Sequence, residues 1–213
     1  MLGGEEGRLV LNARVQQRGF TIVELLVGIT ILAILLALGA PAMGTYLQNS
    51  KLGSAASNYF QGAQMARTEA IRRNVRTEFV LTDTPIATAN LANVVAPAVN
   101  GRNWIVRAAA GGGLFTLLEA KSGAEGDASS SATGHVQITG AAVAPAVFDG
   151  RIPFNGFGAT ANGAGYLIDI KNPSAGVCVA DGGTLRCRRI TVSPGGQIVS
   201  CDPMAPPGDS RAC

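Results

Sequence analysis

The sequence predicts an α+β protein in which a long N-terminal helix packs against an antiparallel β-sheet domain. Three observations predict this fold. An apolar segment, residues 20–40, is followed by an amphipathic segment, residues 41–73, and residues 74–213 alternate short apolar runs with glycine-rich turns. Glycine accounts for 28 of the 213 residues and aromatic residues for only 5%, which favours a loop-rich β domain over a dense helical core.

The first half of the helix is expected to be transmembrane. Residues 20–40 are almost wholly apolar, and about 20 such residues suffice for a helix to cross the hydrocarbon core of a bilayer. Glu24 is the one charged residue in this segment. Burying a carboxylate in a bilayer costs about 2.5–3.5 kcal/mol on insertion scales, so a charge retained there indicates a functional site that needs a partner.

The second half of the helix has one apolar face. Its residues recur at alternating steps of four and three: Leu52, Ala56, Tyr59, Ala63, Ala66 and Ala70. We expect this stripe to pack on the β domain of the same chain; an intermolecular interface is the alternative. Pro41 and Gly44 predict a bend or a local loss of helix between the two halves, because proline removes a backbone hydrogen bond.

Short strands with alternating or apolar character are expected beyond the helix. They fall at residues 77–82, 103–108, 135–139, 146–154 and 166–171. Residues 84–101 and 155–165 are predicted to be loops. Residues 111–134 combine an apolar patch at 114–118 with a low-complexity run at 123–134. Two turns, at 181–184 and 193–196, predict two hairpins near the C-terminus.

Four cysteines cluster in the last 36 residues and indicate two disulfides, because the chain carries an export segment. If Gly182 and Gly183 form a two-residue hairpin loop, Cys178 lies opposite Cys187. Facing residues of antiparallel strands have Cα atoms about 4.5–5.5 Å apart, within the range of a disulfide. Cys201 then pairs with Cys213.

A zinc site is the alternative use of these cysteines. Their spacing contains no paired C-x-x-C motif, and the only histidine, His135, lies far upstream. We therefore expect disulfides rather than a metal, and no cofactor.

The residues around Glu24 carry a family resemblance. Arg18 is followed by Gly19-Phe20-Thr21-Ile22-Val23-Glu24 and an unbroken apolar run. This segment resembles the processing site of type IV prepilins and type II secretion pseudopilins. The resemblance implies that residues 1–19 are a leader, that prepilin peptidase cleaves after Gly19, that the amine of Phe20 is methylated, and that Glu24 guides assembly.

After such cleavage, the positive amine of Phe20 on a neighbouring subunit is the natural partner for Glu24, because pairing two buried charges offsets their desolvation cost. An ordinary signal anchor is the alternative interpretation. Secretory signals, however, are cleaved after the apolar core, whereas Gly19 precedes it.

Three further segments, residues 66–73, 151–158 and 188–196, are similar to the branch that contains pseudopilin H of type II secretion (GspH) and the minor pilins FimU and FimT. This resemblance implies a β-sandwich on the helix and a non-enzymatic subunit at or near a filament tip, which supports filament initiation and assembly. The implied partners are other minor pilins or pseudopilins, the major subunit, prepilin peptidase and the inner-membrane assembly platform. The implied location is the bacterial inner membrane, single-pass with a periplasmic C-terminus, and then the filament tip.

DNA binding and catalysis are the alternative functions. Some FimT-like pilins bind DNA through arginines near the C-terminus, and Arg186, Arg188, Arg189 and Arg211 are the corresponding candidates. A charged edge strand protected against unwanted pairing explains the same arginines. Without residues 1–19 the chain has 14 basic and 12 acidic side chains, too small an excess to indicate nucleic-acid binding by itself. We found no nucleophile elbow, phosphate loop or metal-binding histidine pair, so a membrane-anchored enzyme has no motif in its favour.

Overall fold

The computed structural model describes residues 20–123, 136–206 and 208–213, without the side chains of residues 38–42. The expected leader, His135 and most of the low-complexity run lie outside the described residues. The chain divides into two compact units, Met1–Ala42 and Met43–Cys213. Helix α1 (Ile22–Arg73) contributes to both.

Helix α1 is assigned without interruption through Pro41 and Gly44, so the local loss of helix that we considered there is not found. Among the described residues, no helix combines the length and hydropathy needed to cross a membrane. The transmembrane segment predicted at residues 20–40 is therefore not confirmed.

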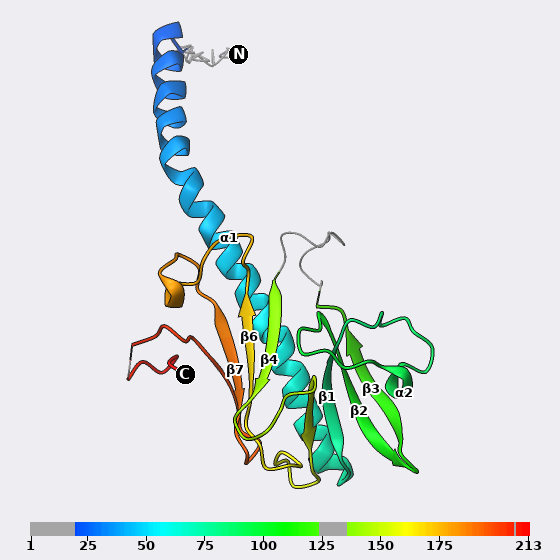
Figure 1. Cartoon of the computed structure of the whole chain (residues 1–213). Helices are drawn as coiled ribbons and strands as arrows, with labels where there is room; N and C mark the ends of the chain where they lie inside the picture. The colour runs from blue at the N-terminus through cyan, green and yellow to red at the C-terminus, as the bar shows by residue number, and fades with distance from the viewer. Residues whose placement is uncertain (1–19, 124–135, 207) are drawn as a thin grey trace, which may run out of the picture. The chain divides into compact units, whose positions relative to one another are not determined.

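Two four-stranded antiparallel sheets make up most of the unit Met43–Cys213, and they lie side by side along α1 (Figure 1). The first has the order β3-β2-β1-β5, with bounds Leu114–Lys121, Asn103–Gly111, Thr77–Thr82 and Arg151–Phe154. The second has the order β4-β6-β7-β8, with bounds Gln137–Ala142, Tyr166–Lys171, Arg188–Val192 and Ile198–Cys201. The predicted fold class, a long helix packed on antiparallel sheets, is confirmed.

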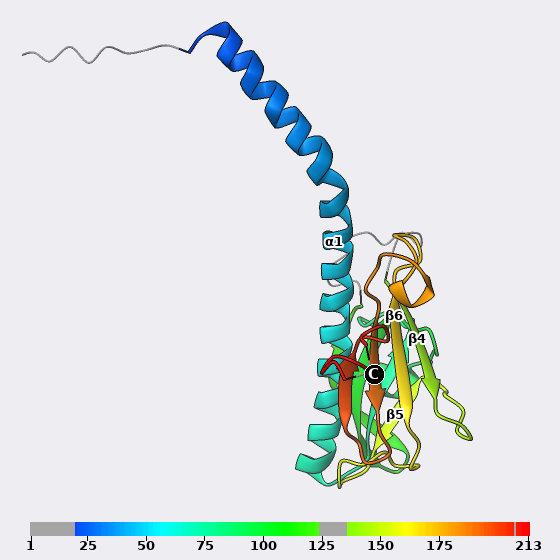
Figure 2. The ribbon, with the colours of Figure 1, turned by 90° about the vertical axis from the view of Figure 1, so that its left-hand side faces the viewer.

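The second half of α1 covers both sheets and completes their common core (Figure 2). All six residues of the predicted apolar stripe are buried, with exposed fractions of 0–3%. They pack with Phe79 and Val106 of the first sheet and with Ile168 and Ile190 of the second. Gly62 lets the helix approach closely, because a Cβ atom there would lie 2.8 Å from the Phe79 ring. The stripe is thus an intramolecular core surface, as predicted.

The outer face of the first sheet is also covered, which the alternating pattern of residues 77–82 did not predict. Every residue of β1 is buried. Helix α2 (Leu91–Val94), within the segment 84–101 that we expected to be a loop, packs Leu91 against Val80 and Ile105. A second, smaller apolar cluster therefore lies on this face, and residues 84–101 are not wholly irregular.

Three strand predictions need correction. The apolar patch at residues 114–118 belongs to a full strand, β3, which pairs with β2 around Gly111, Gly112 and Gly113, all with positive φ. Only the last four residues of the strand expected at 146–154 are extended, as β5. The strand expected at 135–139 is β4, and it runs on to Ala142. Glycines and short segments weaken the period-2 signal at each of these places.

The two predicted C-terminal turns differ in outcome. Residues 193–196 form a turn between β7 and β8, where the Ser193 N–H donates to the Gln197 carbonyl at 2.9 Å. Residues 181–184 do not close a regular hairpin: Val179–Asp181 is a 3₁₀ turn (η1), and Cys178 forms a parallel bridge with Leu185. Our hairpin register for this segment is wrong.

Candidate functional site

Helix α1 begins with a cap made by Thr21. The Thr21 hydroxyl accepts a hydrogen bond from the backbone N–H of Glu24 at 3.1 Å, and the Thr21 carbonyl accepts one from the N–H of Leu25 at 3.1 Å. Threonine followed by glutamate three residues later is the spacing of a capping box, and an acid in the first turn is favoured by the helix dipole. The sequence contained this T-x-x-E signal, but our predictions did not use it.

Glu24 stands on an exposed apolar helix surface. The exposed fractions of Phe20, Ile22 and Val23 are 83%, 79% and 68%. The large apolar side chains of the following turns are also exposed: Leu25, Leu26, Val27, Ile29, Ile31, Leu32, Ile34, Leu35 and Leu36. Among the described residues, no hydrogen bond or ion pair reaches the Glu24 carboxylate. This unit therefore presents a broad apolar surface with one carboxylate that has no partner in the described chain.

The predicted cleavage site lies at the edge of what the structure describes. Gly19 is outside the described residues, and Phe20 and Thr21 precede the helix in irregular conformation. Cleavage after Gly19 and methylation of Phe20 stay predictions. Only two residues, Phe20 and Thr21, separate the predicted cleavage site from Ile22, the first helical residue.

Both predicted disulfides are present in the structure. Cys178 pairs with Cys187 at a Cα separation of 5.5 Å, and Cys201 pairs with Cys213 at 5.0 Å. The first pair is the one that we predicted, although the two cysteines do not face each other across a hairpin. The second pair joins the end of β8 to the chain terminus.

The first disulfide closes a segment that is fastened to α1. The backbone N–H of Arg186 donates to Asn49 Oδ1 at 2.8 Å, and Asn172 Nδ2 donates to Gln48 Oε1 at 3.0 Å. These contacts join the segment 172–187 to the part of α1 that begins the second unit. They give Gln48 and Asn49 a structural role that the sequence pattern did not indicate.

The candidate DNA-contacting arginines are mostly paired with carboxylates. Arg189 donates to both oxygens of Asp169, at 2.6 and 3.0 Å, and this bonding raises the pKa of Arg189. Arg188 lies 4.0 Å from a carboxylate oxygen of Asp202.

Arg211 forms a 2.7 Å ion pair with Asp209, and hydrogen bonds from Arg211 lower the pKa of Asp209 to about 2. Among the described residues, only Arg186 of the four candidates has no ion pair. The four arginines therefore do not form a free cationic surface.

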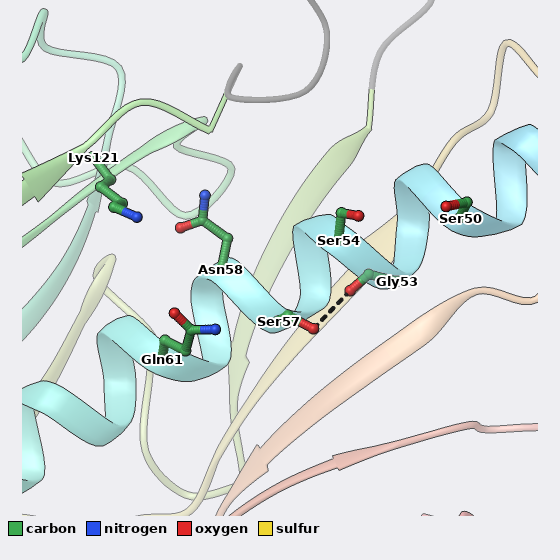
Figure 3. Close-up of a pocket in the computed structure, with 7 residues that line it drawn as sticks. All are labelled: Ser50, Gly53, Ser54, Ser57, Asn58, Gln61 and Lys121. Atoms are coloured by element: carbon green, nitrogen blue, oxygen red, sulfur yellow. Dashed lines mark hydrogen bonds between the residues drawn. The ribbon is translucent and has the colours of Figure 1, made fainter.

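A polar groove runs beside α1 in the second unit (Figure 3). Its volume is about 610 Å³, and it is lined by Ser50, Gly53, Ser54, Ser57, Asn58, Gln61 and Lys121. Ser57 Oγ donates to the Gly53 carbonyl at 3.0 Å. The lining offers hydroxyls, amides and an amine but contains no carboxylate or imidazole that would activate a serine.

Comparison with known proteins bears on the N-terminal segment. Residues 14–40 match the family model described as the prokaryotic N-terminal methylation motif. This match confirms the resemblance to type IV prepilins and pseudopilins at the N-terminus, and it spans Gly19, Phe20 and Glu24. No curated protein matches the chain.

Two solved structures are similar in fold, and both are crystal forms of the type IV minor pilin FimU from Pseudomonas aeruginosa. The first shares 17% identity over 72% of this chain and 90% of FimU, with a TM-score of 0.45. The second shares 17% identity over 70% of this chain and 90% of FimU, with a TM-score of 0.42. We draw no functional conclusion from a likeness at this level.

Proposed function

We propose that the chain is a minor pilin or pseudopilin, a non-enzymatic structural subunit at or near the tip of a type IV pilus or type II secretion pseudopilus. In this role it supports filament initiation and assembly. One observation carries the proposal: the methylation motif leads directly into a capped apolar helix whose carboxylate, Glu24, has no partner in the described chain.

Processing would create the missing partner. Cleavage after Gly19 by prepilin peptidase leaves a positive amine on Phe20, and methylation keeps that charge. In the inner membrane or in a filament core, an isolated carboxylate is costly, and so is an isolated ammonium group. An ion pair between Glu24 of one subunit and the Phe20 amine of the next offsets both costs. Because Glu24 lies in the first turn of α1 and the Phe20 amine only two residues before that helix, this pairing also sets the axial register of the subunits.

The Thr21 cap supports this arrangement. The hydroxyl of Thr21 is occupied by the backbone N–H of Glu24, which directs the helix to start two residues after the new N-terminus. The carboxylate then lies within one turn of the amine-bearing end of its own helix. We infer that the cap keeps the Phe20 amine and the Glu24 carboxylate of each subunit at nearly the same height along the helix axis. The amine of one subunit can then pair with the carboxylate of its neighbour.

Substitutions of Glu24 test the proposed role of this residue in assembly. Glu24→Ala removes the acid and Glu24→Gln keeps its shape without charge, so both variants should insert into the inner membrane at wild-type levels. Both should fail to cross-link to neighbouring filament subunits, because the pairing that sets the register is lost. Asp181→Asn, which removes an exposed carboxylate in the second unit, is the matched control and should cross-link normally. Wild-type cross-linking by both Glu24 variants would show that Glu24 has no assembly role and that the segment is only an anchor.

DNA binding, as in FimT-like pilins, is the second candidate function, and Arg186 is the residue that favours it. Its guanidinium has no ion pair among the described residues, whereas Arg188, Arg189 and Arg211 are each paired with an aspartate. A filter-binding titration of the wild type and Arg186→Ala with duplex DNA at two salt concentrations distinguishes the two candidate functions. A DNA-binding subunit binds more weakly when Arg186 is replaced. A tip subunit without DNA contacts shows no binding that depends on Arg186.

A further inference from the structure

A polar pocket lies between β5, at the edge of the first sheet, and the start of β6. Its volume is about 230 Å³, which is below the roughly 300–1,000 Å³ of pockets for drug-sized ligands. Three apolar residues form part of its wall, and five polar residues complete it: Arg76, Asp149, Arg151, Asn162 and Tyr166. The pocket therefore combines two guanidinium groups with a carboxylate, an amide and a phenol, in a space that suits a small molecule.

The guanidinium group of Arg151 has a donor without an acceptor. Arg151 Nη1 donates to Asp149 Oδ2 at 3.1 Å, and the Arg151 backbone N–H donates to Asp149 Oδ1 at 3.1 Å. The Nε–H of Arg151, by contrast, is buried without a hydrogen-bond partner, alone among the side-chain nitrogens and oxygens of the described residues. Such groups are rare in native proteins, because a buried donor without an acceptor costs free energy. The chain itself thus leaves this guanidinium group unsaturated.

Arg76 brings a second guanidinium group with an excess of positive charge. Its Nη2 donates to Glu78 Oε1 at 2.7 Å, and its side chain is 55% exposed. The other Glu78 oxygen accepts two hydrogen bonds from Arg107, at 2.6 and 2.9 Å, and both residues of that pair are buried. Because Arg107 already neutralises Glu78, the charge of Arg76 is left in excess. Three arginines against two carboxylates give this region a net charge of one positive unit.

Backbone hydrogen bonds hold the walls of the pocket in place. The Leu81 N–H donates to the Gly150 carbonyl at 2.8 Å, and the Ala161 N–H donates to the Pro153 carbonyl at 2.8 Å. Gly150, between the two charged residues of its wall, has φ +88°, and a Cβ atom there would lie 2.7 Å from the backbone nitrogen of Ala98. The fold therefore sets the shape of the pocket before a ligand arrives, which reduces the conformational entropy lost on binding.

Tyr166 and Asn162 add neutral hydrogen-bonding groups to the pocket. Asn162 Nδ2 donates to the Tyr166 hydroxyl at 2.7 Å, and the same hydroxyl lies 2.9 Å from Asn162 Oδ1. Burial raises the pKa of Tyr166, so its hydroxyl stays protonated and neutral. An amide and a phenol both donate and accept hydrogen bonds, and they can therefore bind a hydroxyl substituent of a ligand beside its charged group.

We propose that this pocket binds a small hydroxycarboxylate, with the carboxylate on the guanidinium groups of Arg76 and Arg151 and the hydroxyl on Asn162 and Tyr166. The inference does not depend on the proposed function. The planar fork of a guanidinium group matches the two oxygens of a carboxylate, which also supply the acceptors that Arg151 lacks. A net charge of one positive unit suits a monoanion better than a phosphate dianion.

Lactate is the probe, because it carries a carboxylate beside a hydroxyl, and lactamide is its neutral counterpart. Backbone amide NMR spectra of the purified full chain in detergent micelles are recorded during titration with sodium lactate, with sodium chloride keeping the ionic strength constant. The amide signals of Gly150 and Arg151 should shift with saturation at a Kd of about 1 mM. Lactamide should give no saturable shift, and inorganic phosphate should bind more weakly than lactate.

Two variants separate a site from a general effect of charge. Arg76→Met removes one guanidinium group of the pocket and should weaken lactate binding about tenfold or more. Arg102→Met is the matched control, because Arg102 is 60% exposed, lies 3.6 Å from Asp83 and does not line the pocket; it should bind lactate like the wild type.

The outcomes decide the proposal. Saturable binding of lactate that is lost in Arg76→Met and kept in Arg102→Met supports it. The absence of a saturable shift with lactate, or equal losses in the two variants, would show that the pocket is not an anion site. Equal binding of lactamide overturns recognition of the carboxylate, and tighter binding of phosphate overturns the assignment to a monoanion.

Discussion

The outer face of the first sheet contains a buried ion pair whose removal should be costly. Glu78 is 2% exposed and Arg107 is 7% exposed at the side chain, and Arg107 donates to one Glu78 oxygen at 2.6 and 2.9 Å. Arg107 also donates to the Ala92 carbonyl at 2.7 Å and lies 4.0 Å from the centre of the Phe115 ring. Arg107→Met keeps the apolar stem over that ring but leaves Glu78 without its buried partner.

The expected loss can be estimated from these contacts. Breaking a buried pair by removing one partner costs about 3–5 kcal/mol. Arg76, 2.7 Å from the other Glu78 oxygen, still compensates part of the charge, so we expect a loss near the lower limit, about 3 kcal/mol. For a protein of this size, about 3 kcal/mol lowers the melting temperature by roughly 6–12 °C.

The matched control is Arg76→Met. Arg76 contacts the same carboxylate, but its side chain is 55% exposed, and exposed ion pairs contribute only about 0–1 kcal/mol. Thermal unfolding of the purified protein in detergent, followed by circular dichroism, compares the two variants. Equal and small shifts for Arg107→Met and Arg76→Met would refute the account of Glu78 as a buried charge held by Arg107.

Two further predictions concern the disulfides and acid. Two double variants each remove one disulfide: Cys178→Ala with Cys187→Ala, and Cys201→Ala with Cys213→Ala. Each should destabilise the protein by about 3 kcal/mol in the chain-entropy model. Non-reducing peptide mapping of each variant should recover only the remaining disulfide. A Cys187–Cys201 peptide in the wild type would contradict the pairing. Hydrogen bonds from Arg72, the larger cause, and from Arg73 lower the pKa of Glu69 to about 2. The ionised Glu69 carboxylate therefore stabilises the fold above the usual glutamate pKa, and this stabilisation is lost as the pH falls toward 2. Urea unfolding at pH 6 and pH 3 should therefore show a smaller acid loss for Glu69→Gln than for the wild type, and equal losses would contradict this linkage.

The helix and its buried face were predictable because their signal is periodic. The stripe from Leu52 to Ala70 repeats over about five turns, and a repeat of that length identifies the buried face without knowledge of the partner strands. Strands β1, β2 and β6 were found at or near their predicted positions for the same reason. The cysteine pairs also came from local information, although the turn that we used to derive the first pair has a different geometry.

The remaining features depend on contacts between residues that are distant in sequence. Arg107 reaches Glu78 across 29 positions, and the buried character of β1 follows from α2, which has only four residues. Strand β3 was missed because none of its residues is buried, so it has no clear inward face. The pocket beside β5 draws its lining from residues between Arg76 and Tyr166, and such a grouping produces no periodic pattern. Likewise, Arg189 pairs with Asp169 and Arg188 with Asp202, which lie 20 and 14 positions away in the sequence. The Arg211–Asp209 pair, by contrast, is local.

Processing of the N-terminus tests the central claim most directly. Intact mass and N-terminal sequencing of the protein purified from native membranes should show a chain that begins at Phe20 with a methylated amine, because the motif places cleavage after Gly19. That amine is the charge on which the proposed pairing with Glu24 depends. A chain that still begins at Met1, or one that is cut beyond Ala40, would contradict the assignment of this protein as a pilin-type filament subunit.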